Sequence, residues 1–340
     1  VRDNQKIIVY WSVFHCQLQK ITTDKRSGMS KNIVITPWHC LVTALGWLLI
    51  VPAAFSQNPT TRQQDFIYKS VDGHDIRATI YLPEPQGAYP VLIYFHGGSF
   101  TFGNREQGLE QVLKEKLLAN NIAIVSADYR LAPETKLGEI MQDARDMVTW
   151  IKANGKVQFN VNPNRIVVGG GSAGGYLALS TGFDPESAPA AIVSISSPTG
   201  FSTKGIQTGD LNLLKIIKKD SIVSYGDYST RMDLWRYLAK NGLALYAIFG
   251  FDPVKEPQKL TRYTLTNNIK DSYPPILIIH AKNDRLVKFD DAVVFHKFLQ
   301  DQKIETELYV VDEGHSSDLI NRYPDAIDRI VLFLQKQFNR

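Results

Sequence analysis

Cysteine is scarce in this chain. Only Cys16 and Cys40 occur among its 340 residues, and both lie within the first 56. The chain after residue 56 therefore has no thiol, which excludes a disulfide framework and a cysteine-based zinc site from that part. If this chain is exported, the lack of disulfides is compatible with a protein of the bacterial envelope or a secreted protein.

An excess of charge of one sign is also missing from most of the chain. The formal charge of +4 arises in residues 1–56, which hold six basic and two acidic residues. The remaining 284 residues carry 32 basic and 32 acidic groups. Binding to nucleic acid needs a basic surface that neutralises phosphates, so we expect no nucleic-acid partner.

The apolar run at residues 40–51 is too short for a typical membrane-spanning helix, which needs about 20 residues. A lysine precedes this run, prolines flank it, and small residues follow at positions 54 and 56, as in a secretory signal peptide cleaved before Gln57. The alternative is a membrane anchor. We predict a secreted or periplasmic protein with no stable membrane span after cleavage, organised as an upstream extension (1–28), a signal peptide (29–56) and a tether (57–64).

Beyond the tether, strand-like and helix-like segments alternate. Two strand-like runs, 65–71 and 75–82, are joined at Asp72-Gly73, which is a hairpin signal. The order predicts one α/β domain over 65–340, with a mostly parallel mixed sheet and helices on both faces. Residues 199–271 interrupt the alternation and are expected to form a lid or cap insertion. The further expected strands are 90–95, 122–127, 165–168, 190–196, 275–281 and 305–311, and the expected helices are 106–120, 138–154 (ended by Gly155), 290–302 and 325–338.

One glycine-rich stretch stands between an expected strand and an expected helix. Gly170, Ser172 and Gly174 form G-x-S-x-G, the nucleophile elbow, in which glycines leave room for a serine at a sharp strand-to-helix turn. The pattern alone is weak, because it occurs by chance in about one chain of this length in ten. A phosphate loop is the alternative, but no lysine follows as a Walker motif requires.

A serine nucleophile needs a base and an acid that orients the base. His315 follows the strand expected at 305–311, and Asp284 follows the strand expected at 275–281. The chain order serine, aspartate, histidine is the one found with the nucleophile elbow. Asp284 is preferred over the nearby Asp312, and we expect structural or exposed roles for the other histidines considered, which are His74, His280 and His296.

Stabilisation of the oxyanion needs two backbone N–H groups. Ala173, which follows the serine, can supply one. The other is expected from Gly97 or Gly98, with Gly98 as the first choice, because these glycines follow the strand expected at 90–95 and let the main chain approach a substrate.

Three segments now show a resemblance to a known family: HGGSF (96–100), DYRLAPE (128–134) and GGGSAGG (169–175). With the late aspartate and histidine, they resemble the α/β-hydrolase serine esterases related to hormone-sensitive lipase. The segment KNDRLVKFDDA (282–292) is more similar to that of the bacterial esterase and prolyl-oligopeptidase-like branches. The resemblance implies the α/β-hydrolase fold, Ser172 as nucleophile, Asp284 as acid and His315 as base, with Gly97, Gly98 and Ala173 as oxyanion donors.

Two positions depart from this family, because Ser99 replaces a glycine and Gly171 replaces a frequent acidic residue. Glu134 and Asp143 belong to the same motif region, and we expect them to form ion pairs or cap a helix. Aromatic residues of the insertion could shape a substrate pocket, although such residues more often form a core: Phe201, Tyr225, Trp235, Tyr246 and Phe249.

The sequence thus predicts a serine hydrolase that cleaves carboxylic esters, with small acyl groups and without a metal or organic cofactor. Its expected partner is a small-molecule ester. An amidase, aryl-formamidase or peptidase would use the same residues and stays open, as does a non-catalytic binding protein of the same fold. Neither the natural substrate nor the oligomeric state follows from the sequence.

Overall fold

The computed structural model describes residues 62–84, 87–201, 203, 208–216 and 227–340. The predicted upstream extension and signal peptide (1–56), with both cysteines, lie outside these residues, and so does Tyr225. The localisation predicted from that leader therefore stays a prediction.

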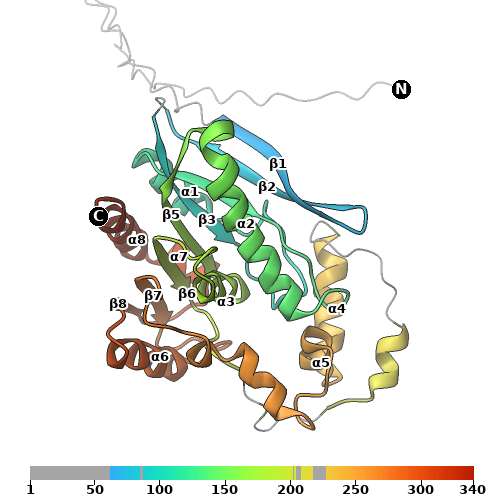
Figure 1. Cartoon of the computed structure of the whole chain (residues 1–340). Coiled ribbons are helices and arrows are strands. Elements are labelled where there is room, and N and C mark those ends of the chain that lie inside the picture. Colours follow the sequence, from blue (N-terminus) through green and yellow to red (C-terminus); the bar gives the residue numbers. More distant parts are fainter. Residues whose placement is uncertain (1–61, 85–86, 202, 204–207, 217–226) are drawn as a thin grey trace, which may run out of the picture. The chain divides into compact units, whose positions relative to one another are not determined.

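A single mixed sheet of eight strands, in the order β1-β2-β4-β3-β5-β6-β7-β8, forms the frame of the described part (Figure 1). β1 and β2 pair antiparallel, as do β2 and β4, and all other neighbours are parallel. This confirms the predicted mostly parallel mixed sheet. The strands are β1 (Arg62–Val71), β2 (His74–Leu82), β3 (Tyr89–Phe95), β4 (Ala123–Ala127), β5 (Val161–Gly171), β6 (Ala191–Ile195), β7 (Ile276–Ala281) and β8 (Thr306–Val311).

Helices cover both faces of this sheet. Buried side chains of α2, α3 and α6 pack on one face, and those of α1, α7 and α8 pack on the other. The arrangement follows from the strands, whose residues are apolar on both sides as expected of a sheet covered twice. The helices are α1 (Gln111–Ala119), α2 (Leu137–Phe159), α3 (Ala173–Ser180), α4 (Tyr228–Lys240), α5 (Ala244–Phe249), α6 (Phe289–Asp301), α7 (Ser317–Arg322) and α8 (Pro324–Phe338).

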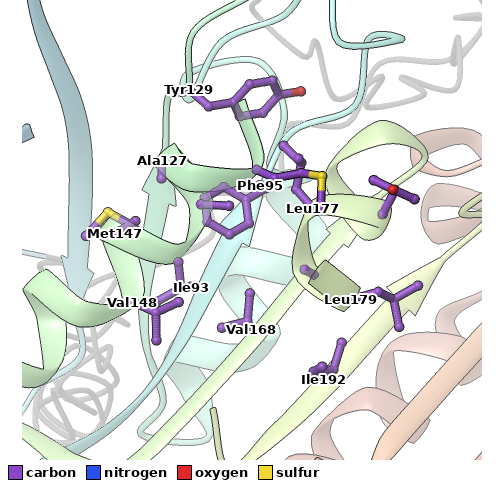
Figure 2. Close-up of a cluster of buried hydrophobic side chains, with 14 of the residues drawn as sticks. Ile93, Phe95, Ala127, Tyr129, Met147, Val148, Val168, Leu177, Leu179 and Ile192 are labelled. Atoms are coloured by element: carbon purple, nitrogen blue, oxygen red, sulfur yellow. The ribbon is translucent and has the colours of Figure 1, made fainter. Parts of the chain in front are cut away.

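The core beneath the elbow is densely apolar. Figure 2 shows strand residues Ile93, Phe95 and Val168 together with Met147 of α2 and Leu177 of α3. These five side chains are fully buried. Burial of each such side chain stabilises the fold by roughly 1.5–3 kcal/mol, which gives the serine turn a rigid base.

The interval 199–271 holds α4, α5 and three short 3₁₀ segments among its described residues: Leu211–Ile216, Pro257–Tyr263 and Leu265–Asn267. Its role as a lid stays a prediction. No helix in the described part of the chain is long and apolar enough to cross a membrane.

Three local expectations about helices were wrong. Gly155 does not end α2, which continues to Phe159 and ends at Asn160 in a left-handed conformation (φ 57°). A Cβ at Gly155 would lie 3.3 Å from Val161 Cβ, so this glycine lets the helix pack closely on the start of β5. No helix was expected between β8 and residue 325, but the chain there forms a short helix, α7, and α1 begins at Gln111 and not at residue 106.

Candidate active site

The turn between β5 and α3 presents Ser172 in a strained conformation. Its φ of 54° and ψ of −120° lie outside the regions that an L-residue prefers. Such a residue costs on the order of 1–3 kcal/mol and persists only where its surroundings hold it. Here the Ser172 N–H donates to the carbonyl oxygen of Ile195 on β6, at 2.8 Å.

The glycines of the turn are required by close approach. A Cβ at Gly170 would lie 2.5 Å from the Gly174 carbonyl carbon, and a Cβ at Gly174 would overlap the carbonyl oxygen of Phe95. Both contacts are with backbone, which cannot move aside. The elbow therefore tolerates no side chain at either glycine.

The structure also explains why glycine stands at position 171. A Cβ on Gly171 would collide with Oγ of Ser316, the residue that follows His315. The Ser316 N–H donates to Ser196 Oγ at 3.0 Å, so the histidine loop is fastened next to β6. In this chain Ser316 occupies the space that a side chain at position 171 would need.

Asp284 and His315, predicted from separate segments, meet at the ends of β7 and β8. His315 Nδ1 lies 2.7 Å from Asp284 Oδ2. The other carboxylate oxygen, Oδ1, accepts hydrogen bonds from the N–H groups of Leu286 (2.8 Å) and Val287 (3.0 Å). Because the carboxylate only accepts, His315 Nδ1 carries the proton and Nε2 is left free to accept one.

The protonation state of Asp284 follows from these contacts. Burial raises the pKa of this carboxyl, but hydrogen bonds from His315 and from the N–H groups of Val287 and Leu286 outweigh it and hold the pKa below its ordinary value of 3.8. Asp284 is therefore ionised at neutral pH.

Ser172 and His315 line one pocket of about 450 Å³, together with Gly97 and Gly98. Asp284 lies behind His315 with a fully buried side chain. The position of a Cβ on Gly97 would be 3.4 Å from Ser172 Cβ, and Gly98 has a φ of 116°, a conformation that favours glycine. Ala173 is the first residue of α3. The structure thus gathers all six predicted site residues at one edge of the sheet.

Two histidines near this site were not predicted to matter. His280, fully buried on β7, has Nε2 3.0 Å from the carbonyl oxygen of Val287 and 3.4 Å from Asp284 Oδ2. His96 lies under the glycine loop, where its ring stacks on Tyr129 at 4.2 Å and Nδ1 donates to the Gly97 carbonyl at 2.7 Å. Burial lowers the pKa of both histidines, so they are neutral at pH 7. The sequence signal that could have indicated a role for His96 is its place directly before the two glycines in HGGS (96–99).

The charged residues of DYRLAPE each form a buried or half-buried ion pair. Arg105 Nη1 lies 2.6 Å from Asp128, and Arg130 Nε lies 2.8 Å from Asp143. Asp143 also accepts from Lys69 Nζ at 2.7 Å, and Glu134 pairs with an arginine of α4. Glu134 and Asp143 thus each form an ion pair with a basic residue, as expected from the sequence.

Part of the pocket that Ser172 and His315 line is apolar. Its wall includes Phe102, Tyr228, Met232 and Trp235, of which only Trp235 was considered from the sequence. Two other aromatic residues of the insertion pack elsewhere: Phe201 meets Phe249 at 4.9 Å within the main core.

The described residues contain no group of three or more histidine, cysteine or acidic side chains arranged to hold a metal ion. The groups that line the pocket at this edge of the sheet include a serine hydroxyl, an imidazole and the backbone of the glycine loop. The fold is the α/β-hydrolase fold of solved carboxylesterases, which confirms the fold that the resemblance implied. The chain belongs to the BD-FAE family, whose model matches residues 78–299.

Solved structures with the same fold include the carboxylesterase EstE1 from a metagenomic library, with a TM-score of 0.61 and 22% identity over 82% of this chain and 89% of that one. The esterase Est2 of Thermogutta terrifontis gives a TM-score of 0.58 and 21% identity, covering 81% and 90%.

Among curated relatives, the carboxylic ester hydrolase LipN of Mycobacterium tuberculosis is 35% identical over 31% of this chain and 27% of its own length. The non-reducing polyketide synthase atr1 of Stereocaulon alpinum is 34% identical over 41% of this chain and 6% of its own. The chain thus spans only a small share of these relatives' lengths.

Proposed function

We propose that the protein is a serine hydrolase that cleaves carboxylic esters of small acyl groups through an acyl-enzyme. The hydrogen bond between His315 Nδ1 and Asp284, with His315 and Ser172 on the same pocket, carries this proposal. The remaining steps follow from the tautomer that the hydrogen bond selects.

In the first half of the reaction, Ser172 Oγ forms a bond to the ester carbonyl carbon while His315 Nε2 accepts the hydroxyl proton. Asp284 stabilises the resulting imidazolium. The carbonyl oxygen becomes an oxyanion and accepts hydrogen bonds from the N–H groups of Ala173 and of Gly97 or Gly98. Collapse breaks the bond to the alcohol oxygen, which leaves with the proton from His315.

In the second half, a water molecule attacks the acyl-enzyme. His315 takes the water proton and returns it to Ser172 Oγ, and the carboxylic acid departs. No electron transfer occurs and every proton passes through His315, so the chemistry needs no cofactor. The preference for small acyl groups is supported by a pocket of about 450 Å³ that must hold both halves of the ester.

Export is the corresponding proposal for localisation. The basic residue, apolar run and small residues of positions 29–56 support secretion or transfer to the periplasm, followed by cleavage before Gln57. Expression of the full sequence in a bacterial host, with N-terminal sequencing of the periplasmic fraction, tests it. A mature protein starting at Gln57 is expected, whereas an uncleaved cytoplasmic product contradicts the proposal.

A substrate series tests the activity. Purified protein is assayed with p-nitrophenyl acetate, butyrate and octanoate and with the matching anilides, beside the variant S172A. We expect hydrolysis of the esters, greatest for the short acyl groups, and none by S172A. Faster hydrolysis of the anilides would favour an amidase or peptidase, and equal rates for wild type and S172A would refute the serine mechanism.

A further inference from the structure

Helix α4 presents one face to the active-site pocket. Tyr228, Met232 and Trp235 recur at helical spacing and line the same pocket as Ser172. Phe102, which follows the glycine loop, contacts both aromatic rings edge-on, with centroids 5.7 Å from Tyr228 and 5.9 Å from Trp235. This apolar wall therefore spans the insertion and the main domain.

The same helix carries a charged residue that is almost wholly buried. Arg231 is 5% exposed, although arginine is rarely buried without a partner. Its Nη1 atom lies 3.1 Å and 2.9 Å from the two carboxylate oxygens of Glu134. The side chains of the pair are 7% and 3% exposed, so water screens their attraction little.

Glu134 belongs to the turn that precedes α2. The same turn also forms a hydrogen bond to α5, the helix that follows α4 in the insertion. Lys136 Nζ donates to the carbonyl oxygen of Ala247, in α5, at 3.0 Å. In contrast, the ion pair of Arg236 with Asp233, also on α4, has side chains that are 64% and 72% exposed, and it joins the helix only to itself. The buried pair is thus an attachment of the pocket wall to the main domain.

We propose that the Glu134–Arg231 pair is a specificity-determining element that fixes α4, and with it the apolar wall, at the distance from Ser172 that a longer or bulkier acyl group needs. This rests on the proposed esterase function. His315 must protonate the leaving alcohol, so the acyl group extends away from His315, and in this proposal it packs on the apolar wall. An acetyl group is too short to extend far from the serine, so it makes little contact with the wall.

The test uses tryptophan fluorescence beside kinetics. Trp150 and Trp235 are the only tryptophans after residue 56, so W150F leaves Trp235 as the reporter of the wall. In this background R231M leaves the Glu134 carboxylate buried without its cation, E134Q removes only the charge, and R236M is the matched control on the exposed pair. We expect R231M to lower the ratio of kcat/KM for octanoate over acetate at least ten-fold and to shift Trp235 emission to the red.

E134Q is expected to change both readouts in the same direction by less, and R236M to change neither. An unchanged ratio in R231M and E134Q overturns the proposal, whatever the emission does, and so does an equal loss on both esters. If R231M does not fold, E134Q decides by the same criteria. If even the wild type cleaves no ester, the proposed function fails, and Trp235 emission alone decides whether the pair holds α4.

Discussion

Replacement of Asp284 by asparagine should reverse the tautomer of His315. Oδ1 of Asp284 accepts two backbone hydrogen bonds, from Leu286 and Val287 at 2.8 Å and 3.0 Å. In D284N these donors keep the amide oxygen where it is, because the amide nitrogen cannot accept from them. The amide nitrogen is then turned toward His315 Nδ1 as a donor, so Nδ1 must accept and the proton moves to Nε2.

An imidazole protonated at Nε2 cannot take the proton of Ser172. The same change of tautomer in a serine protease lowers kcat about 10⁴-fold, which corresponds to about 5.4 kcal/mol of transition-state stabilisation. We expect a loss of this order for D284N with p-nitrophenyl acetate. The fold should remain, because asparagine has the same shape and keeps the two backbone hydrogen bonds.

The assay is kcat/KM for the acetate ester between pH 6 and 9, with the melting temperature and circular dichroism of both proteins as controls for folding. A folded D284N protein that retains activity within about ten-fold of the wild type would refute the reasoning. A different acid, such as Asp312, would then have to orient His315.

Three further predictions concern the frame of the site. G174A places a methyl group against a backbone carbonyl of β3 and should lower the free energy of unfolding in urea by about 3 kcal/mol or more. In the control G200A the added methyl group meets nothing within 4 Å, so this variant should be as stable as the wild type. Equal effects of the two substitutions would contradict the role of close packing at Gly174. D143N removes the negative charge that pairs with the buried Arg130 guanidinium, so it should lower the free energy of unfolding by about 3–5 kcal/mol and leave kcat unchanged. A loss of kcat without a loss of stability would instead indicate a catalytic role for Asp143. Because the pKa of Asp284 is held below 3.8 in the folded protein, its ionised form stabilises the fold above about pH 4, and this stabilisation is lost as pH falls through the lowered value. The difference in unfolding free energy between wild type and D284N should therefore be constant from about pH 5 upward and shrink below pH 4, and a difference that grows on acidification would have the wrong sign.

Much of the site could be predicted because parallel strands bring their carboxyl ends to one edge. Ser172, Asp284 and His315 each follow a strand, so their chain order and strand positions already implied that they meet. The glycines could be placed for the same reason, since a turn over a packed sheet leaves no room for side chains.

Contacts between distant segments could not be predicted in this way. That Ser316 occupies the space beside Gly171 depends on how the β8 loop folds back over β5. Likewise, nothing in the sequence around Arg231 indicates Glu134 as its partner, 97 positions away. His280 looked like an ordinary core residue because its strand is apolar, yet the turn after that strand brings Asp284 within 3.4 Å of it.

Ser172 is the proposed nucleophile, and covalent labelling tests this role most directly. The purified protein is treated with a fluorophosphonate probe, digested, and the adduct is located by mass spectrometry, with S172A and heat-denatured protein as controls. We predict one adduct, on Ser172, absent from both controls. An unlabelled Ser172 with the other serines equally unreactive, or a label on a different serine, would contradict the account.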